Sequence, residues 1–114
     1  MEHFMRLNAR PFELIKNGQK TIELRLYDDK RKKIKPGDLI KFANVENGGT
    51  VICQVVKLHL FPSFARLYSS LPLFECGYTE EDIGGADAKD MDQYYTTEEQ
   101  RKYSVVGIEL SLLS

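Results

Sequence analysis

The chain has 114 residues, of which 42% are hydrophobic and 29% are charged. This composition excludes a disordered chain, and the length predicts one globular domain over residues 1–114 that buries its core without disulfide bonds. No apolar run approaches the roughly 18 residues that a membrane helix needs, so we expect no membrane association. The first residues lack the apolar core of a secretory signal, and Cys53 and Cys76 lack metal or redox spacing. We therefore expect a cytoplasmic protein with reduced thiols.

The net charge of −1 hides an asymmetry between the two halves of the chain. Residues 1–57 carry a balance of +5, and residues 58–114 carry a balance of −6. The positive charge is densest in KRKKIK, residues 30–35, which contains Lys30, Arg31, Lys32, Lys33 and Lys35. Such a basic loop is either a solvated surface segment or a contact for phosphate groups, depending on whether it borders a cleft.

The first half of the chain predicts two strands, at 3–7 and 21–27, with a short helix at 10–18 between them. Pro11 suits the first turn of that helix, and Gly18 suits a left-handed position after its end. The basic loop follows, and Pro36–Gly37 has the residues of a type II turn.

The second half predicts strands at 38–44 and 50–61, joined as a hairpin, and a final strand at 104–113. Residues 63–71 predict a helix with Ser63 as its N-cap, and the acidic region 79–103 predicts one or two more helices. Helices inserted irregularly among five strands predict an α+β fold, built as a small mixed β-barrel of five or six strands with peripheral helices. The tyrosines and phenylalanines are expected mainly in the core.

Several kinds of site find no support in the sequence. No glycine-rich loop has the pattern that cradles phosphates, and His3 and His59 have no partner at metal-ligand spacing. The aspartates of DAKDMD, residues 87–92, do not follow the alternation of a calcium loop. We therefore expect neither a metal nor a cofactor.

One group of charged residues remains on the strand at 21–27. Alternation places Ile22, Leu24 and Leu26 on one face, whereas Glu23 and Arg25 share the other face, about 7 Å apart. Lys20 lies at the entrance of the strand, within reach of that second face. These three side chains are either a surface ion-pair cluster worth at most about 1 kcal/mol or the floor of a binding site.

Gly18-x-Lys20-x-x-Glu23-x-Arg25 resembles the G-x-K-x-x-E-x-R signature of the ASCH domain, a relative of the PUA fold. The segments KPGDLIKF, residues 35–42, and YYTTEEQRKYSVVGIEL, residues 94–110, are also similar to that family. The resemblance spans nearly the whole chain. It implies a small β-barrel with peripheral helices, in which the three signature residues line a cleft for RNA or a modified nucleoside.

One branch of this family hydrolyses the acetyl amide of N4-acetylcytidine, using a lysine, a threonine three positions later and a downstream glutamate. The chain resembles this branch at Lys20, but Glu23 occupies the position of the threonine. Glu75 is the candidate for the downstream acid. Without the hydroxyl, hydrolysis would need Glu23 as a general base on water, with Lys20 or Arg25 stabilising the oxyanion.

The sequence therefore leads to two hypotheses from different classes. The first is a module that binds RNA or a modified nucleoside through Lys20, Glu23 and Arg25, aided by the basic loop. The alternative is a small amidohydrolase that deacylates an N4-acylated cytidine-type nucleoside, with Lys20, Glu23 and Glu75 as catalytic residues. An adaptor that binds another protein is a third class, for which the chain offers no feature, and a protein partner stays unknown.

Overall fold

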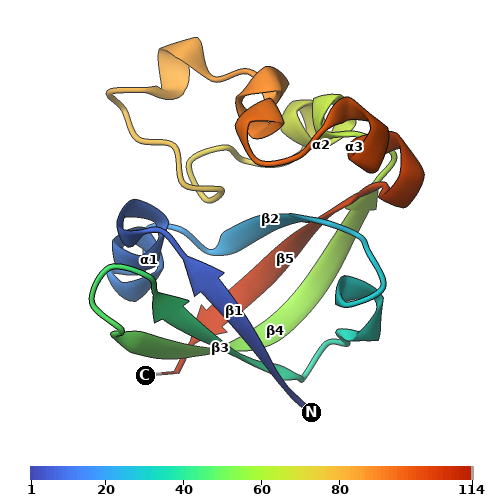
Figure 1. The fold of residues 1–114 in the computed structure, drawn as a ribbon. Coiled ribbons are helices and arrows are strands. Elements are labelled where there is room, and N and C mark those ends of the chain that lie inside the picture. Colours follow the sequence, from blue (N-terminus) through green and yellow to red (C-terminus); the bar gives the residue numbers. More distant parts are fainter. Residues whose placement is uncertain (114) are drawn as a thin grey trace.

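The protein is a curled five-stranded sheet, closed only partly into a barrel, with a helical lobe above one end (Figure 1). The computed structural model describes residues 1–113. The sheet is mixed, since β1 pairs with β3 in parallel and every other pairing is antiparallel. In spatial order the strands are β1 (Glu2–Leu7), β3 (Leu39–Asn44), β4 (Thr50–Phe61), β5 (Val105–Leu112) and β2 (Ile22–Leu26). The predicted α+β fold, a small mixed barrel-like sheet with peripheral helices, is confirmed with five strands and only partial closure.

Helix α1 (Ala9–Lys16) packs beside the sheet, and its apolar face buries Phe12 and Ile15. Gly18 follows the helix with a φ of +87°, a left-handed conformation that glycine adopts without a steric penalty. The chain thereby reverses, and the backbone N–H of Lys20 donates to the Leu14 carbonyl at 2.9 Å. This reversal fixes where β2 begins.

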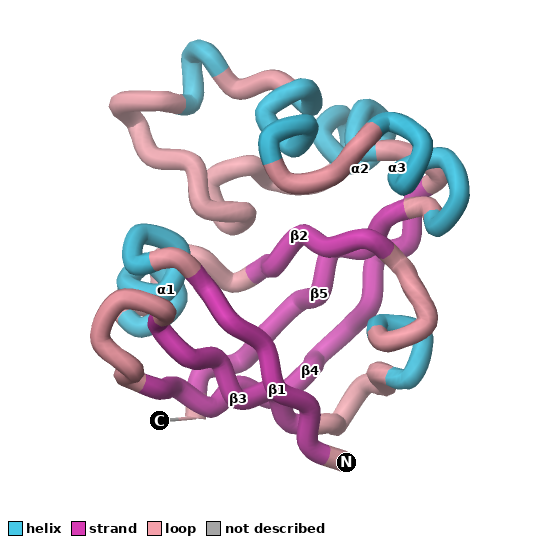
Figure 2. Tube along the Cα trace, in the orientation of Figure 1, coloured by secondary structure: helices cyan, strands magenta, loops and turns pink. Residues whose placement is uncertain are grey.

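The helical lobe contains α2 (Phe64–Ser70) and α3 (Thr97–Tyr103), joined by a long connection that Figure 2 shows mostly as loop. Ser63 caps α2 by accepting a hydrogen bond from the Arg66 N–H, as the sequence predicted. Thr96 and Glu99 form a capping box at the start of α3. The connection itself holds two short 3₁₀ helices, Ile83–Gly85 and Ala88–Gln93. The acidic region is therefore more divided than the one or two helices expected from its sequence.

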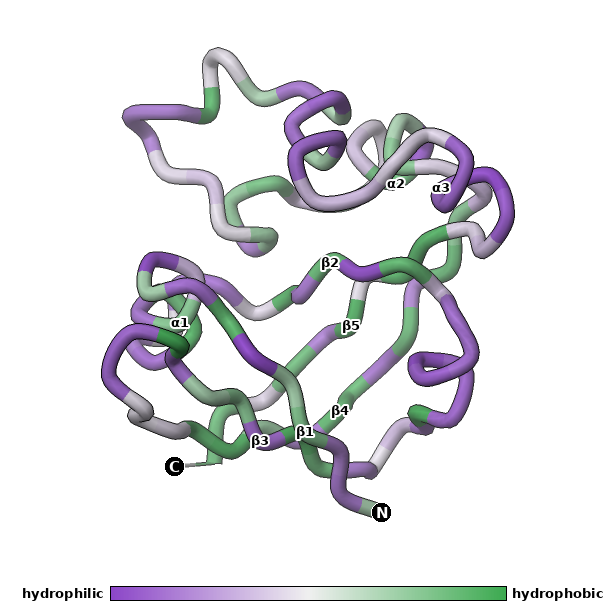
Figure 3. Tube along the Cα trace, viewed as in Figure 1, coloured by the Kyte–Doolittle hydropathy of each residue, from purple (hydrophilic) through white to green (hydrophobic). Residues whose placement is uncertain are grey.

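Two apolar clusters form the core of the protein. The barrel cluster lies inside the sheet under α1 and includes Phe42 and Ile40. The second cluster joins β2 to the lobe, because Ile22, Leu24 and Leu26 pack with residues such as Phe64 and Leu67 of α2. The two faces of β2 consequently have different surroundings. Figure 3 shows the basic loop after β2 as mainly purple, that is, hydrophilic.

The sheet stays open between β1 and β2, which are its two edge strands. Side chains from the β2 side cross this seam. Arg25 donates through Nη2 to the Arg6 carbonyl at 2.9 Å, and Lys30 donates through Nζ to the Phe4 carbonyl at 3.1 Å. Edge carbonyls that would otherwise lack a strand partner are thereby satisfied. Within residues 1–113, no helix has the length and apolar character to cross a membrane.

Candidate functional site

A cavity of about 520 Å³ lies between the barrel and the helical lobe. Its lower side is formed by the end of β1, by α1 and by β2, and its upper side by the lobe. Lys20, Glu23 and Arg25 all contribute to its lining. The volume falls in the range of roughly 300–1,000 Å³ that is usual for small-molecule sites. The structure thus brings the three signature side chains together at a cavity.

Glu23 is the centre of this group. Its Oε1 lies 2.8 Å from Lys20 Nζ, and its Oε2 lies 2.6 Å from Arg25 Nε. Glu23 is only 4% exposed and Lys20 only 8%, so this is not a solvated surface cluster. Arg25 is intermediate in burial and also reaches the Arg6 carbonyl across the seam. The face of β2 that the sequence left undecided is therefore a buried ionic triad.

Burial and ion pairing act in opposite directions on the Glu23 carboxyl. Burial by itself raises its pKa, but the neighbouring charges of Lys20 and Arg25, with their hydrogen bonds, outweigh it. The net result lowers the pKa of Glu23 from 4.5 to about 2. The same opposition acts on Arg25. Burial by itself lowers the pKa of its guanidinium, but the Glu23 carboxylate outweighs burial and raises that pKa. At neutral pH the triad consists of one anion between two cations.

Gly77 has no side chain, and this leaves room for the Lys20 side chain to reach Glu23. A Cβ at residue 77 would lie 3.2 Å from Lys20 Cδ, closer than ordinary van der Waals contact allows, and the φ of Gly77 is +110°. The backbone of the lobe can therefore lie directly against the stem of the lysine. The sequence did not identify this residue, since ECGY carries no motif by which to recognise it.

The upper wall of the cavity is rich in tyrosine. The side chains that line it are those of Tyr68, Tyr78, Tyr94 and Tyr95. They belong to α2 and to the connection between α2 and α3, so they approach the cavity from separate segments. Sequence reasoning had expected the aromatic residues mainly in the core. The one available signal was the Tyr94–Tyr95 pair within an otherwise polar segment.

A hydrogen-bonded chain links part of this wall. The Tyr68 and Tyr78 hydroxyls lie 2.7 Å apart, and the Tyr78 hydroxyl donates to Asp90 Oδ2 at 2.6 Å. Burial raises the pKa of Tyr68 to about 12, and burial together with the Asp90 acceptor raises the pKa of Tyr78. Both hydroxyls are therefore neutral donors over the physiological pH range.

The basic loop lies outside the cavity lining, next to its Arg25 end. Arg31 is paired with Asp28 at 3.1 Å, and the charges of both residues act on Tyr95 of the cavity wall. Lys30 crosses the seam to β1, and Lys32 lies over the Tyr27 ring at 5.9 Å. Lys33 and Lys35 are exposed. The loop is thus a partly anchored cationic surface beside the cavity.

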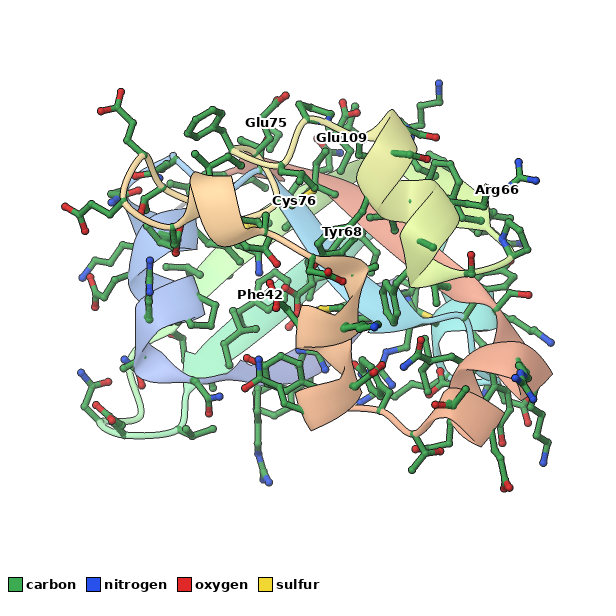
Figure 4. The ribbon with its side chains drawn as sticks, turned by 90° about the horizontal axis from the view of Figure 1, so that it is seen from above. Phe42, Arg66, Tyr68, Glu75, Cys76 and Glu109 are labelled. Atoms are coloured by element: carbon green, nitrogen blue, oxygen red, sulfur yellow. The ribbon has the colours of Figure 1, made fainter. Side chains whose placement is uncertain are left out.

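Glu75 lies apart from the triad. It is exposed, outside the cavity lining, and its Oε1 accepts a hydrogen bond from the Thr21 hydroxyl at 3.2 Å. The Glu75 backbone carbonyl receives the N–H groups of Thr21 and Ile22, which attaches the lobe to the start of β2. In Figure 4, Tyr68 and the adjacent Cys76 lie towards the middle of the molecule, whereas Glu75 lies near its periphery.

Both cysteines are free and buried, and Cys76 lines the cavity. Burial raises the pKa of each thiol to about 11, so neither is a thiolate nucleophile at neutral pH. Across residues 1–113, no group of three or more His, Cys, Asp or Glu side chains is arranged to hold a metal ion.

The signature residues, the cavity and the curled sheet point to one family. The model of the ASCH domain matches residues 5–114. The chain belongs to the ASCH domain family.

Solved structures agree with this ASCH assignment. The crystal structure of hypothetical protein PH0355 is 36% identical, with a TM-score of 0.82, and the match covers 99% of this chain and 100% of that one. The solution structure of protein PF0455 from Pyrococcus furiosus is 35% identical, with a TM-score of 0.74, and the match covers 100% of this chain and 99% of that one. No curated protein matches the sequence.

Proposed function

We propose that this ASCH domain binds RNA or a modified nucleoside, with a base held in the cavity between β2 and the helical lobe. The observation that carries the proposal is the ionic triad of Lys20, Glu23 and Arg25 lying below a wall of tyrosines. Aromatic side chains offer faces on which a base stacks, and charged groups bind its polar edge or its phosphate. An ASCH-type cleft is suited to this class of ligand.

The triad retains capacity for a ligand after its internal contacts are made. Lys20 has three donors and Arg25 has five, of which the contacts with Glu23 and Arg6 use only some. The N–H groups of Lys20 and Arg25 that these contacts leave unused are donors, and they suit a carbonyl or phosphate oxygen of a ligand. Because Glu23 fixes both cations in place, these donors are already oriented before a ligand arrives.

The basic loop extends the proposed binding surface. Lys30, Arg31, Lys32, Lys33 and Lys35 lie beyond the Arg25 end of the cavity, where phosphates flanking a bound base would pass. Several of these cations are exposed and free to approach a polyanion. In this proposal the cavity holds one base, and the loop holds the adjoining backbone.

Binding is favoured over hydrolysis by the state of Glu23. A general base works best with a pKa near the working pH, whereas the pKa of Glu23 is about 2 and both its oxygens are engaged by cations. Glu75, the other acid that hydrolysis would require, lies outside the cavity lining. The geometry therefore supports a ligand-binding role for the triad.

The experiment is a binding titration of short fluorescent single-stranded RNAs and of a panel of free nucleosides. Tyr94→Ala is the principal variant, because Tyr94 lines the cavity yet is 56% exposed, so its removal should spare the fold. Leu60→Ala is the matched control, since Leu60 is 53% exposed on β4 and lies outside the cavity. We expect roughly a fivefold to hundredfold loss of affinity for Tyr94→Ala, the range for one lost stacking contact. Equal affinity of Tyr94→Ala and Leu60→Ala would refute the cavity as the binding site.

The same panel tests the hydrolase alternative. It includes N4-acetylcytidine, and mass spectrometry of the mixture detects any cytidine released. Release that is lost in Glu75→Gln and in Lys20→Met would establish the hydrolase instead. Lys57→Met is the control for the lysine variant, because Lys57 is an exposed residue of β4 outside the cavity.

A further inference from the structure

The two walls of the cavity differ in hydrogen-bonding character. The β2 wall presents the donors of Lys20 and Arg25, held by Glu23. The lobe wall presents Asp90, a carboxylate that belongs to the 3₁₀ helix Ala88–Gln93 and also lines the cavity. A ligand that spans the cavity therefore meets donors on one side and an anionic acceptor on the other.

Asp90 is held in a fixed orientation by its own contacts. Its Oδ2 accepts hydrogen bonds from the Tyr78 hydroxyl at 2.6 Å and from the Asp87 backbone N–H at 3.2 Å. Tyr78 is in turn connected to Tyr68 of α2. Its other oxygen, Oδ1, accepts no hydrogen bond from residues 1–113. One carboxylate oxygen is thus anchored in the lobe, while the other keeps its full capacity as an acceptor.

We infer that Asp90 is a specificity-determining residue, which selects bases that carry an exocyclic amino group. This inference rests on the proposed function of the cavity. A carboxylate oxygen accepts from an amino group but repels a carbonyl oxygen, so a base with an amine at this edge is preferred to the same ring with a carbonyl. Lys20 and Arg25 then bind the acceptors on the opposite side of the ligand.

The contacts of Asp90 also predict the behaviour of its amide variant. In Asp90→Asn the side chain keeps its shape, but only one of its two terminal atoms is an acceptor. The Asp87 N–H can only donate, so the amide oxygen must take the anchored position of Oδ2. The amide nitrogen then lies where Oδ1 was, so a donor replaces an acceptor at this position of the lining residue. The variant should therefore favour a carbonyl over an amine.

The test uses two pairs of probes that exchange an amino group for a carbonyl, cytidine with uridine and adenosine with inosine, as 5′-monophosphates or as short homopolymers. We expect the wild-type protein to prefer the amino member of each pair on the order of tenfold, the discrimination typical of one base-edge contact. Asp90→Asn should abolish or reverse this preference. Asp92→Asn is the matched control, because Asp92 is exposed, bonds Gln100 and lies outside the cavity, and it should retain the wild-type ratio.

The outcomes separate this inference from the proposed function. Binding of all probes with equal affinity by the wild-type protein would overturn the role of Asp90 and leave the binding function standing. A preference that persists in Asp90→Asn would overturn it as well, and would leave Asp90 as a purely structural anchor of the lobe. Absence of binding to every probe would overturn this inference, and it would also overturn RNA as the ligand in the proposed function. Even if Asp90→Asn folds poorly, equal affinity of the wild-type protein for both members of each pair would still overturn the inference.

Discussion

Arg25 joins the two edge strands of the sheet by donating from Nη2 to the backbone carbonyl of Arg6 at 2.9 Å. The same guanidinium donates from Nε to Glu23 at 2.6 Å. This side chain therefore bridges the open seam of the half-barrel, as Lys30 also does, and it fixes one wall of the cavity. Guanidinium geometry allows both contacts at once, because its donors form a rigid planar fork.

Arg25→Lys should weaken the seam although it preserves the charge. A lysine ammonium is a point charge without the fork, so it cannot serve Glu23 and the Arg6 carbonyl in the same geometry. We expect the free energy of unfolding to fall by about 1.5–3 kcal/mol, the value for a lost hydrogen bond to a charged group. Urea denaturation measures this loss, and hydrogen exchange should show less protection in β1. Lys30→Gln removes the exposed contact to Phe4 and serves as the milder control. Equal losses in both variants would contradict the special role of Arg25.

Glu23 and Lys20 should show strong energetic coupling. Glu23→Gln leaves two cations in a buried site without their anion, which should cost about 3–5 kcal/mol. Lys20→Met should cost much less in the Glu23→Gln background than in the wild-type protein, because its partner is already gone. A double-mutant cycle by chemical denaturation measures the difference. Additive effects would show that the 2.8 Å contact contributes no pairwise energy.

The stability of the protein should decline in acid partly through Glu23. In the unfolded chain this carboxyl binds a proton near pH 4.5, whereas in the folded protein it does so only near pH 2. Between these values the unfolded state holds more protons, so stability is complete above about pH 4.5 and is lost as the pH falls towards 2. The shift corresponds to about 3 kcal/mol. Denaturation of wild type and Glu23→Gln from pH 6 to pH 2 should show the gap between them closing. A gap independent of pH would refute the low pKa.

The basic loop makes RNA binding sensitive to salt in our proposal. Each phosphate that a lysine neutralises releases counterions, so the logarithm of the affinity should fall linearly with the logarithm of the salt concentration. Lys32→Gln combined with Lys33→Gln should reduce the magnitude of that slope by about 1.4, since single strands contribute about 0.7 per phosphate. Titrations from low to physiological salt measure the slope. An unchanged slope would make the loop an ordinary solvated surface.

Gly77→Ala should disturb the lysine that passes beside it. The new Cβ would lie 3.2 Å from Lys20 Cδ, at a φ of +110° that L-residues rarely adopt. We expect a loss of about 1–3 kcal/mol in stability and weaker ligand binding, because Lys20 must shift. Gly84→Ala is the control, since a Cβ at residue 84 would meet no atom within 4 Å and no positive φ is involved. Similar effects of the two substitutions in thermal denaturation and in binding titrations would contradict this account.

Local signals in the sequence were sufficient to locate most elements of the fold. The strand at 50–61 has the observed bounds of β4, and Ser63 and Gly18 mark helix ends by a capping side chain and by backbone freedom. Such signals act within a few residues, so they are readable without the fold. The acidic connection was less predictable, because its 3₁₀ helices depend on contacts with the rest of the lobe.

The sequence by itself determined the family, the five strands and the identity of Lys20, Glu23 and Arg25 as a candidate group, because alternation along a strand is a local property. Only the tertiary structure decided that this group is buried. Glu23 is enclosed because a lobe formed by residues much later in the chain covers β2, an edge strand of the sheet. The same packing brought Gly77, the tyrosines and Asp90 to the cavity from segments that carry no common motif. Contacts between distant segments depend on how whole faces pack together, and no short pattern encodes them.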